Sequence, residues 1–255
     1  MEKGSRVLYP DSTDFCTLET QCSYLKEKNS RMLYRYISEA SSEFVSAVVQ
    51  RGWRRFGNYF FYPICDGCNE CKSLRIDTRG FRPSRSQKRA IKKNRDTRIV
   101  HQKPTVTSHH LLLYNKYHYW KSEKDGWKHN DMSHREYYEN FAEGAHSFGR
   151  EVLYIRDGRL IGVDLIDMVD DGISSVYFFY DPDYAHLSLG IYSLLHQIEL
   201  CQNRGLRYVY LGYWVDGCKA FAYKSSFMPL EILDGFPKIE ESPQWRDFQL
   251  YRDTL

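Results

Sequence analysis

The sequence predicts an α+β fold with a mixed, mostly antiparallel sheet and flanking helices, and three observations support this prediction. Segments rich in β-branched and aromatic residues alternate with Asp-Gly turns, a pattern typical of an antiparallel meander, at residues 150–155, 159–168 and 173–180. Ser188 then begins a helix whose apolar residues recur at helical spacing as far as Cys201. A further apolar strand follows at residues 208–214.

Composition narrows the class of protein. The chain has 255 residues, enough for one large domain or two small ones, and its 42% hydrophobic and 27% charged residues are typical of a soluble globular protein. It has neither an apolar run of the ~20 residues that a membrane span needs nor a signal peptide. Seven cysteines, three of them clustered, do not resemble a secreted disulfide framework. We therefore expect a cytoplasmic protein with no membrane partner.

The first elements are a strand, a helix and a hairpin. The strand is expected at residues 30–37, and Ser41 or Ser42 can cap the helix, because the apolar residues at 44–49 fall at helical spacing. Residues 53–63 predict the hairpin, since Gly57-Asn58 separates two aromatic segments.

Three cysteines follow the hairpin. Cys65, Cys68 and Cys71 are related by two CxxC steps that share a residue, which places three thiolates on one tight turn. Cys22 is the natural fourth ligand and Cys16 the second candidate. This pattern predicts a structural zinc or iron–sulfur site, and the alternative is a reduced knuckle without metal.

A run of positive charge comes next. Between Arg82 and Arg98 eight residues are basic and only Asp96 is acidic, whereas a solvated helix face usually alternates signs. Ser84 and Gln87 have capping-box spacing. On the resulting helix one face carries a stripe spaced to follow phosphates, namely Arg85, Lys88, Arg89 and Lys92. We expect nucleic-acid contact there, and the alternative is a plain basic surface.

The segment before the meander is expected to hold two helices, at residues 108–119 and from Ser133 to Phe141, with a polar loop between them. Glu136 completes a capping box with Ser133.

The final segment, residues 206–231, has an unusual polar content. Four polar residues lie among aromatic residues where an ordinary core would carry Leu and Val, namely Lys224, Tyr213, Tyr223 and Asp216. The alternative for the tyrosines is simple packing with their hydroxyls at the surface.

The order of elements is that of a GNAT-type N-acyltransferase core, in which the strands at 173–180 and 208–214 splay to form a cleft. The sequence predicts a smaller cysteine-containing N-terminal domain at 1–100, the GNAT-like domain at 101–240 and a tail at 241–255. Acetyl-CoA enzymes of this fold carry an R/Q-x-x-G-x-G/A loop, and residues 184–190 lack it, which argues against coenzyme A.

Several motifs together resemble one family, the arginyl-tRNA–protein transferases, and most closely its branch of bacterial aspartate/glutamate leucyltransferases. The resemblance runs from about residue 22 to 231. Its segments are Cys22-Ser-Tyr-Leu25, Gly52-Trp-Arg-Arg55, Tyr62-Pro63 with the cysteine cluster, Leu74-Arg-Ile76, Pro83-Ser-Arg-Ser-Gln-Lys-Arg89, Ser174-Ser-Val-Tyr-Phe-Phe-Tyr-Asp-Pro182, Ser188-Leu-Gly190, Tyr210-Leu-Gly-Tyr-Trp214 and Tyr223-Lys-Ser-Ser-Phe227. The chain departs from the eukaryotic pattern at Cys22-Ser-Tyr-Leu25, where those relatives have a CxxC pair.

The resemblance implies transfer of leucine from leucyl-tRNA to the N-terminal Asp or Glu of proteins destined for degradation, with no cofactor required for the transfer. Alternatives are an arginyl-transferring member of the family, a small-molecule acetyltransferase, and a non-catalytic zinc-knuckle RNA-binding protein. An arginine site should hold buried acids, for which Asp164, Asp167 and Asp216 are candidates.

The aminoacyl ester is already activated, so the protein must position it, keep the attacking amine neutral and stabilise the oxyanion. Asp164 or Asp181 is the candidate base, and Tyr177 the candidate donor to the oxyanion. Lys224 is expected near the tRNA 3′ end or the acidic acceptor residue. The remaining candidates are Arg54 and Arg55 for tRNA phosphates and Arg75 and Tyr213 for the acceptor, with Arg54 as a further option there. A helix-capping Asp181, a structural Asp164 and a core Tyr177 are the corresponding structural alternatives.

Overall fold

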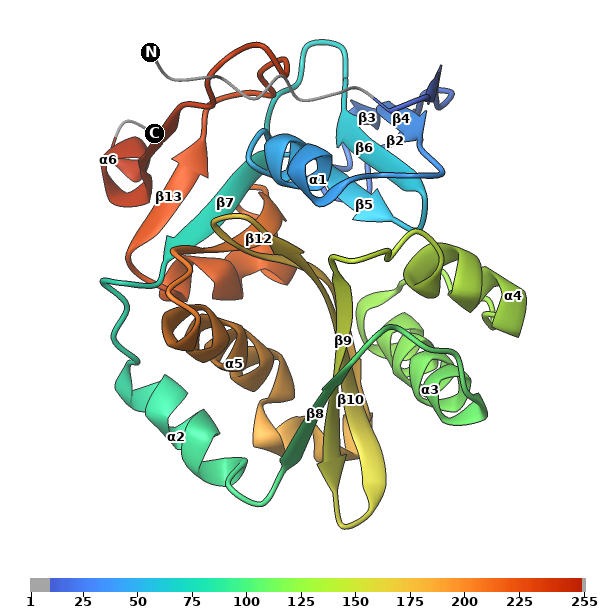
Figure 1. Cartoon of the computed structure of the whole chain (residues 1–255), viewed down its shortest axis with the longest axis vertical. Coiled ribbons are helices and arrows are strands. Elements are labelled where there is room, and N and C mark those ends of the chain that lie inside the picture. The colour runs from blue at the N-terminus through green and yellow to red at the C-terminus, as the bar shows by residue number, and fades with distance from the viewer. Residues whose placement is uncertain (1–9, 254–255) are drawn as a thin grey trace.

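The computed structural model describes residues 10–253, and its centre is one twisted eight-stranded sheet (Figure 1). The strand order is β14-β13-β7-β12-β11-β10-β9-β8, and β11 and β12 form the parallel pair among antiparallel neighbours. The strands are β7 (Lys72–Asp77), β8 (Arg98–Gln102), β9 (Gly149–Arg156), β10 (Arg159–Val169), β11 (Gly172–Tyr180), β12 (Tyr208–Trp214), β13 (Leu230–Leu233) and β14 (Trp245–Asp247). The predicted α+β class with a mostly antiparallel sheet is confirmed.

Helices cover both faces of this sheet (Figure 1). On one face α5 (Leu189–Asn203) packs on β11 and β12, and α2 (Arg85–Lys93) packs on α5. On the other face α3 (Ser108–Asp125) packs on β10 and β11, followed by α4 (His134–Tyr137) and η1 (Tyr138–Ala142). The shorter elements are η2 (Pro182–Leu187), η3 (Lys219–Ser226) and α6 (Phe248–Arg252).

A second, four-stranded sheet stands at one end of the molecule, in the order β1-β4-β6-β5. Its strands are β1 (Thr13–Cys16), β4 (Met32–Tyr36), β5 (Arg54–Phe56) and β6 (Tyr59–Pro63), and β2 (Thr20–Gln21) pairs with β3 (Asn29–Ser30) nearby. Helix α1 (Ser42–Val49) covers one face of this sheet through the contact between Phe44 and Phe60. The predicted hairpin is confirmed, and its turn needs Gly57 because the backbone φ there is +53°.

Local signals in the sequence produced the expected caps. Ser41 accepts a hydrogen bond from the backbone N–H of Phe44 at the start of α1. The capping box of α2 is present, with Ser84 Oγ accepting from Gln87 N (3.3 Å) and Gln87 Oε1 accepting from Ser84 N (2.8 Å). The second box, between Ser133 and Glu136, is present at the start of α4. These three predictions are confirmed.

The predicted boundaries at residues 100 and 240 remain predictions, and the central sheet takes strands from both sides of each, since it contains β7 and β14. The first nine residues of the predicted N-terminal domain and the last two of the predicted tail lie outside the described residues. Within residues 10–253 no helix is both long and apolar enough to cross a membrane.

Candidate active site

A gap between β11 and β12 is the centre of the candidate site. The two strands pair in parallel from Gly172↔Tyr208 to Ser174↔Tyr210, and the pairing then ends although both strands continue. Each strand carries a bulge just beyond this point, because Val176 has no partner on β10 and Leu211 has none on β7. Bulges bend a strand and increase its twist, so the strands part as the sequence predicts.

Arg54 enters the gap from β5. Its Nη1 donates to Ser174 Oγ (3.3 Å), and its Nη2 donates to the backbone carbonyls of Ser175 and Val176, the latter at 3.5 Å. Opposite it, a Cβ on Gly212 would lie 2.8 Å from the Cζ of Arg54, and the backbone φ of Gly212 is +72°. Glycine at this position therefore makes room for the guanidinium, whose pKa is lowered by burial.

Lys224 approaches the other strand from η3. Its Nζ donates to the carbonyls of Leu211 (2.9 Å) and Tyr213 (2.5 Å), and the residue is only 6% exposed. Burial lowers the pKa of Lys224 to about 7, and the charge of Arg54 lowers it further in the same direction. Each bulge thus presents its carbonyl to a cation, Val176 to Arg54 and Leu211 to Lys224.

Asp164 lies on β10, behind the gap on the side of α5. Gln197 Nε2 donates to Asp164 Oδ2 (2.8 Å), whereas Oδ1 has no hydrogen-bond partner among the described residues. Asp164 is fully buried, and this burial raises its pKa to about 7. Tyr223 is close enough to feel both Asp164, which raises its pKa, and Arg54, which opposes the rise. Sequence reasoning missed Gln197, although a polar residue on the inward stripe of an apolar helix was a usable signal.

Two candidate catalytic residues have partners away from the gap. Asp181 Oδ1 accepts from the backbone N–H of Asp183 (3.0 Å) at the start of η2 and forms an ion pair with Lys116 Nζ (2.5 Å). Tyr177 points towards α3, where its hydroxyl lies 2.8 Å from His118 Nε2. The structure therefore brings Lys224 and Arg54 together at the gap. Asp164 lies one strand away on β10, linked to this pair through Tyr223, and Asp181 and Tyr177 have partners elsewhere.

Of the two candidate acceptor-binding residues, Arg75 has partners away from the gap and Tyr213 lies beside it. Arg75 Nε donates to Glu231 Oε2 (2.6 Å), and its guanidinium lies 3.6 Å from the ring centroid of Tyr208. This arginine already has a carboxylate and aromatic partners. Tyr213 borders the gap, with its hydroxyl donating to the carbonyl of Phe61 (3.2 Å).

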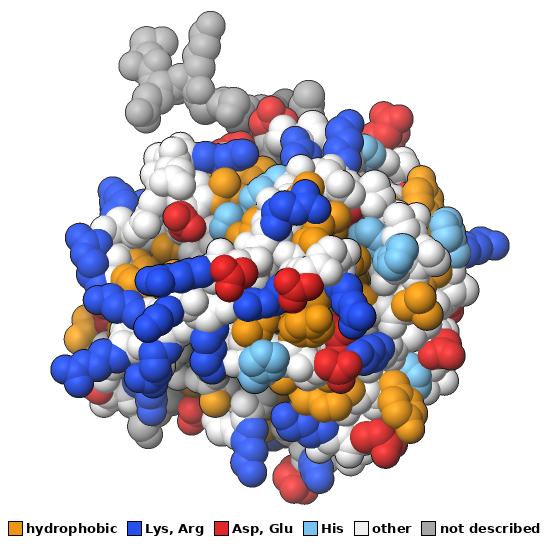
Figure 2. Space-filling view, turned by 90° about the horizontal axis from the view of Figure 1, so that it is seen from below, with side chains coloured by type: hydrophobic (Ala, Val, Ile, Leu, Met, Phe, Trp, Pro, Cys, Tyr) orange, Lys and Arg blue, Asp and Glu red, His pale blue; other side chains and the backbone are white. Residues whose placement is uncertain are grey.

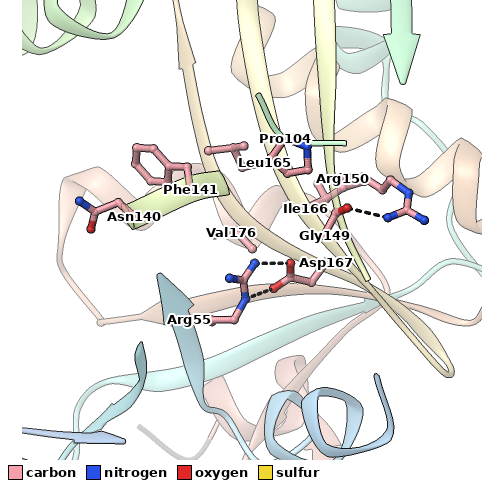
Figure 3. Close-up of a pocket in the computed structure, with 10 residues that line it drawn as sticks. All are labelled: Arg55, Pro104, Asn140, Phe141, Gly149, Arg150, Leu165, Ile166, Asp167 and Val176. Carbon is pink, nitrogen blue, oxygen red and sulfur yellow. Dashed lines mark hydrogen bonds and ion pairs between the residues drawn. The ribbon is translucent and has the colours of Figure 1, made fainter. Parts of the chain in front are cut away.

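Arg55 and Asp167 form a buried ion pair beside a small pocket (Figure 3). Arg55 Nη2 lies 2.6 Å from Asp167 Oδ1 and Nε lies 2.9 Å from Oδ2, with both side chains almost fully buried. A guanidinium held in this way is not presented to a phosphate, in contrast to the sequence prediction for Arg55. The apolar lining of the pocket includes Phe141, Leu165 and Val176, and Val176 also borders the gap.

Helix α2 presents its positive charge to solvent. It packs inward through Gln87 and Ala90, which are buried, while its basic side chains are exposed. Figure 2 shows Lys and Arg side chains gathered on one side of the molecule. No ion pair to an acidic residue of the described chain involves the four stripe residues Arg85, Lys88, Arg89 and Lys92. They are accessible as the nucleic-acid prediction requires.

The four cysteines proposed as metal ligands, Cys22, Cys65, Cys68 and Cys71, lie near one another without forming a metal-binding arrangement. Burial raises the pKa of Cys71 to about 12, and Cys22, Cys65 and Cys68 add to the rise. Cys22 Sγ accepts from a backbone N–H at Tyr24 (3.4 Å). Within residues 10–253, no three His, Cys, Asp or Glu side chains are placed to hold a metal ion. The zinc or iron–sulfur hypothesis therefore rests on sequence spacing alone.

Comparison with known proteins identifies the family of this chain. Residues 20–89 match the family description "Arginine-tRNA-protein transferase, N terminus", and residues 109–234 match the corresponding C terminus. A Campylobacter jejuni protein named aspartate/glutamate leucyltransferase is 46% identical over 228 residues, which is 89% of this chain and 95% of that protein. A Helicobacter hepaticus protein of the same name is 41% identical, over 91% and 96% of the two chains. The solved structure of L-PGS from Bacillus licheniformis matches with a TM-score of 0.39 and 12% identity, over 56% of this chain and 45% of that one.

These matches define the class of protein as an aminoacyltransferase that uses charged tRNA. The chain belongs to the arginine-tRNA–protein transferase family. The family predicted from the sequence motifs is confirmed.

Proposed function

We propose that this protein transfers leucine from leucyl-tRNA to the N-terminal Asp or Glu of other proteins and thereby marks them for degradation. The observation that carries this proposal is the identity of 41–46% with aspartate/glutamate leucyltransferases along almost the entire length of both chains. Because charged tRNA is a cytoplasmic substrate, we place the activity in the cytoplasm.

In this reaction the N-terminal amine of the acceptor attacks the carbonyl carbon of the leucyl ester. A C–N bond forms, the C–O bond to the ribose breaks, the amine loses a proton and the ribose oxygen gains one. No phosphate is hydrolysed and no coenzyme A takes part. The protein must hold the ester and amine together and accommodate the charge that develops on the carbonyl oxygen.

We assign this step to the gap between β11 and β12, in a core of the GNAT type. We assign the role of proton acceptor to Asp164, which lies on the strand next to β11 with its Oδ1 unpartnered among the described residues and with a pKa that burial raises to about 7. Because Asp164 is fully buried, this role requires the site to open when the acceptor binds. Arg54 and Lys224 provide positive charge on the two sides of the gap, which suits the carboxylate of an N-terminal Asp or Glu. Arg75 is less suited, since Glu231 already occupies its guanidinium.

The pocket beside Val176 is smaller than a leucyl side chain in this structure, so it has to widen if it receives one. Its lining includes the apolar Phe141 and Leu165, the paired Arg55 and Asp167, and Arg150, which forms no ion pair with an acid of the described residues. An arginine side chain would need a free buried acid there. This favours leucine over arginine as the transferred group.

The tRNA body is assigned to the exposed stripe on α2. Its lysines and arginines can neutralise phosphates without first breaking an ion pair to the described chain, and such contacts give affinity without sequence preference.

The test is transfer of labelled leucine, and in parallel of labelled arginine, from charged tRNA to peptides that begin with Asp, Glu, Lys or Ala. We expect leucine on the Asp and Glu peptides alone. Arginine in its place would keep the family and reject the leucine assignment, and binding of tRNA without any transfer would indicate an RNA-binding protein.

A matched pair of variants on η3 tests the assignment of the gap. Lys224→Met should lower transfer to the Asp and Glu peptides, because it removes a cation at the gap, whereas Lys219→Met removes an exposed charge from the same helix and should leave transfer unchanged. Equal effects of the two changes would reject the role of Lys224.

A further inference from the structure

One face of the small sheet is covered by aromatic residues that the proposed reaction does not use. This aromatic face consists of six side chains from four strands, namely Phe15, Tyr34, Tyr36, Phe56, Tyr59 and Phe61. Neighbouring residues of a strand point to opposite faces, and Phe60 accordingly packs against Phe44 of α1 on the other side. The aromatic face is therefore separate from the core under α1.

A row of this face leads directly to the gap. In the strand register Arg54 is opposite Phe61, Phe61 is opposite Tyr34, and Tyr34 is opposite Phe15. Directly opposed residues lie on the same face of a sheet, with Cβ atoms about 5 Å apart. The ring centroids of Phe61 and Tyr34 are 5.2 Å apart, and those of Tyr34 and Phe15 are 5.4 Å apart with nearly parallel planes. Three rings thus form a track from the guanidinium in the gap to the edge of the sheet.

The outer part of the aromatic face is open to solvent. Phe15 is 45% exposed, Tyr59 41% and Tyr36 37%. A second row runs parallel to the first, with Phe56 opposite Tyr59 and Tyr59 opposite Tyr36. Aromatic side chains on an open sheet are a recurrent surface for unpaired bases, since every base has a flat face that stacks on a ring.

The position of the track favours a specific occupant. The leucyl ester is attached to the terminal nucleotide of tRNA, so that nucleotide must lie at the gap when the ester reacts there. The unpaired nucleotides that precede it must then lie on a surface that leads away from the gap, and the row that ends at Phe15 begins at Arg54. The cation at one end of the track also suits a negatively charged backbone.

We propose that the aromatic face binds the unpaired 3′ nucleotides of tRNA by stacking and so directs the aminoacyl ester into the gap beside Arg54. This proposal rests on the proposed function and adds a binding surface for the donor that is distinct from the basic stripe on α2.

The test measures equilibrium binding of two uncharged tRNAs at fixed salt concentration. One tRNA is complete, and the other is shortened by its last three, unpaired nucleotides. Phe15→Leu keeps an apolar side chain but removes the ring, and it should weaken binding of the complete tRNA about fivefold or more while binding of the shortened tRNA stays the same. Phe15→Trp should bind the complete tRNA at least as well as the unmodified protein. Tyr36→Leu should repeat the effect of Phe15→Leu from the second row.

Two control variants separate stacking from other effects. Leu18→Ala changes a neighbouring side chain that is 88% exposed, and it should alter neither affinity. Lys88→Ala, on α2, should weaken binding of both tRNAs to the same extent, because it removes a lysine that the proposed function assigns to phosphates of the tRNA body. The thermal midpoint of each variant shows whether the fold is retained.

The proposal fails if Phe15→Leu weakens both tRNAs equally or neither. It also fails if the change instead raises KM for the acceptor peptide alone, because the aromatic face would then bind the acceptor. Failure of the leucyl transfer assay with the unmodified protein is a separate result, since the binding comparison uses uncharged tRNA and requires no transfer.

Discussion

Replacing Arg55 by Met is expected to lower the free energy of unfolding by ~3–5 kcal/mol, because it leaves the carboxylate of Asp167 buried without its partner. The pair is joined by two short contacts, and its side chains are only 5% and 1% exposed. Arg55 also donates to the carbonyl of Gly57 (2.6 Å), and its guanidinium lies 5.2 Å from the ring centroid of Phe148. The expected cost is therefore that of breaking a buried, well-bonded ion pair, whereas a surface change away from such features stays within ~0.5 kcal/mol.

Urea unfolding measures this cost, and a double variant isolates the pair. Arg55→Met combined with Asp167→Leu removes both charges, so its destabilisation should fall short of the summed single effects by ~0.5–3 kcal/mol. Arg89→Met, on the exposed face of α2, is the control that should leave stability nearly unchanged and lower tRNA affinity. If Arg55→Met behaves like that control, the buried ion pair is not what holds Arg55, and the tRNA contact predicted from the sequence is correct.

Three further predictions concern the gap and α2. Single neutralisations on the α2 stripe should each reduce the slope of log affinity against log salt concentration by ~0.7–0.9, as measured by tRNA titrations at several salt concentrations. Gly212→Ala should displace the Arg54 guanidinium and lower the transfer rate by up to about 100-fold, whereas Gly217→Ala, with a similar φ of +70° but open space around it, should cost stability alone. Between pH 4 and 7 Asp164 stays protonated in the folded state only, so its contribution to stability falls by ~1.4 kcal/mol per pH unit, whereas His118 and His196, whose pKa burial lowers to about 4, contribute in the opposite sense below about pH 6.5. In urea titrations Asp164→Asn should therefore make stability rise more steeply with pH over this range, and Lys224→Met should remove a rise of the same size above pH 7, where Lys224 loses its proton in the folded state first.

Features set by neighbours in the chain could be predicted from the sequence. The hairpin at 53–63 follows from a Gly-Asn turn between aromatic segments, and the box of Ser84 and Gln87 from spacing alone. The exposure of the α2 stripe follows from a run of like charge that no helix core can bury. The parting of the strands at 173–180 and 208–214 followed from the order of elements. That order predicts which strands are neighbours in the sheet better than it predicts which side chains are in contact.

Features that depend on distant partners were not predictable in this way. Arg54 and Arg55 are adjacent and look alike in the sequence, so both were expected to contact phosphate. In the structure, alternation along β5 directs Arg54 to Ser174 in the gap and Arg55 to Asp167 in the core, residues more than 100 positions away. Arg75 similarly pairs with Glu231, which lies directly opposite it on the neighbouring strand β13. No spacing rule relates these residues, because only the strand register brings them together.

The backbone carbonyls at the gap bear on both the stability of the fold and the proposed reaction. Two strands that separate at bulges expose carbonyl groups that need donors, and Arg54 and Lys224 supply them. Both cations therefore lie in the place where the reaction is assigned, and their repulsion contributes to the lowered pKa of Lys224. A carboxylate bound between them relieves that repulsion and favours the protonated lysine. In the proposed reaction an acidic acceptor residue would complement the two cations that bind these carbonyls, which gives a physical reason why acceptors would begin with Asp or Glu.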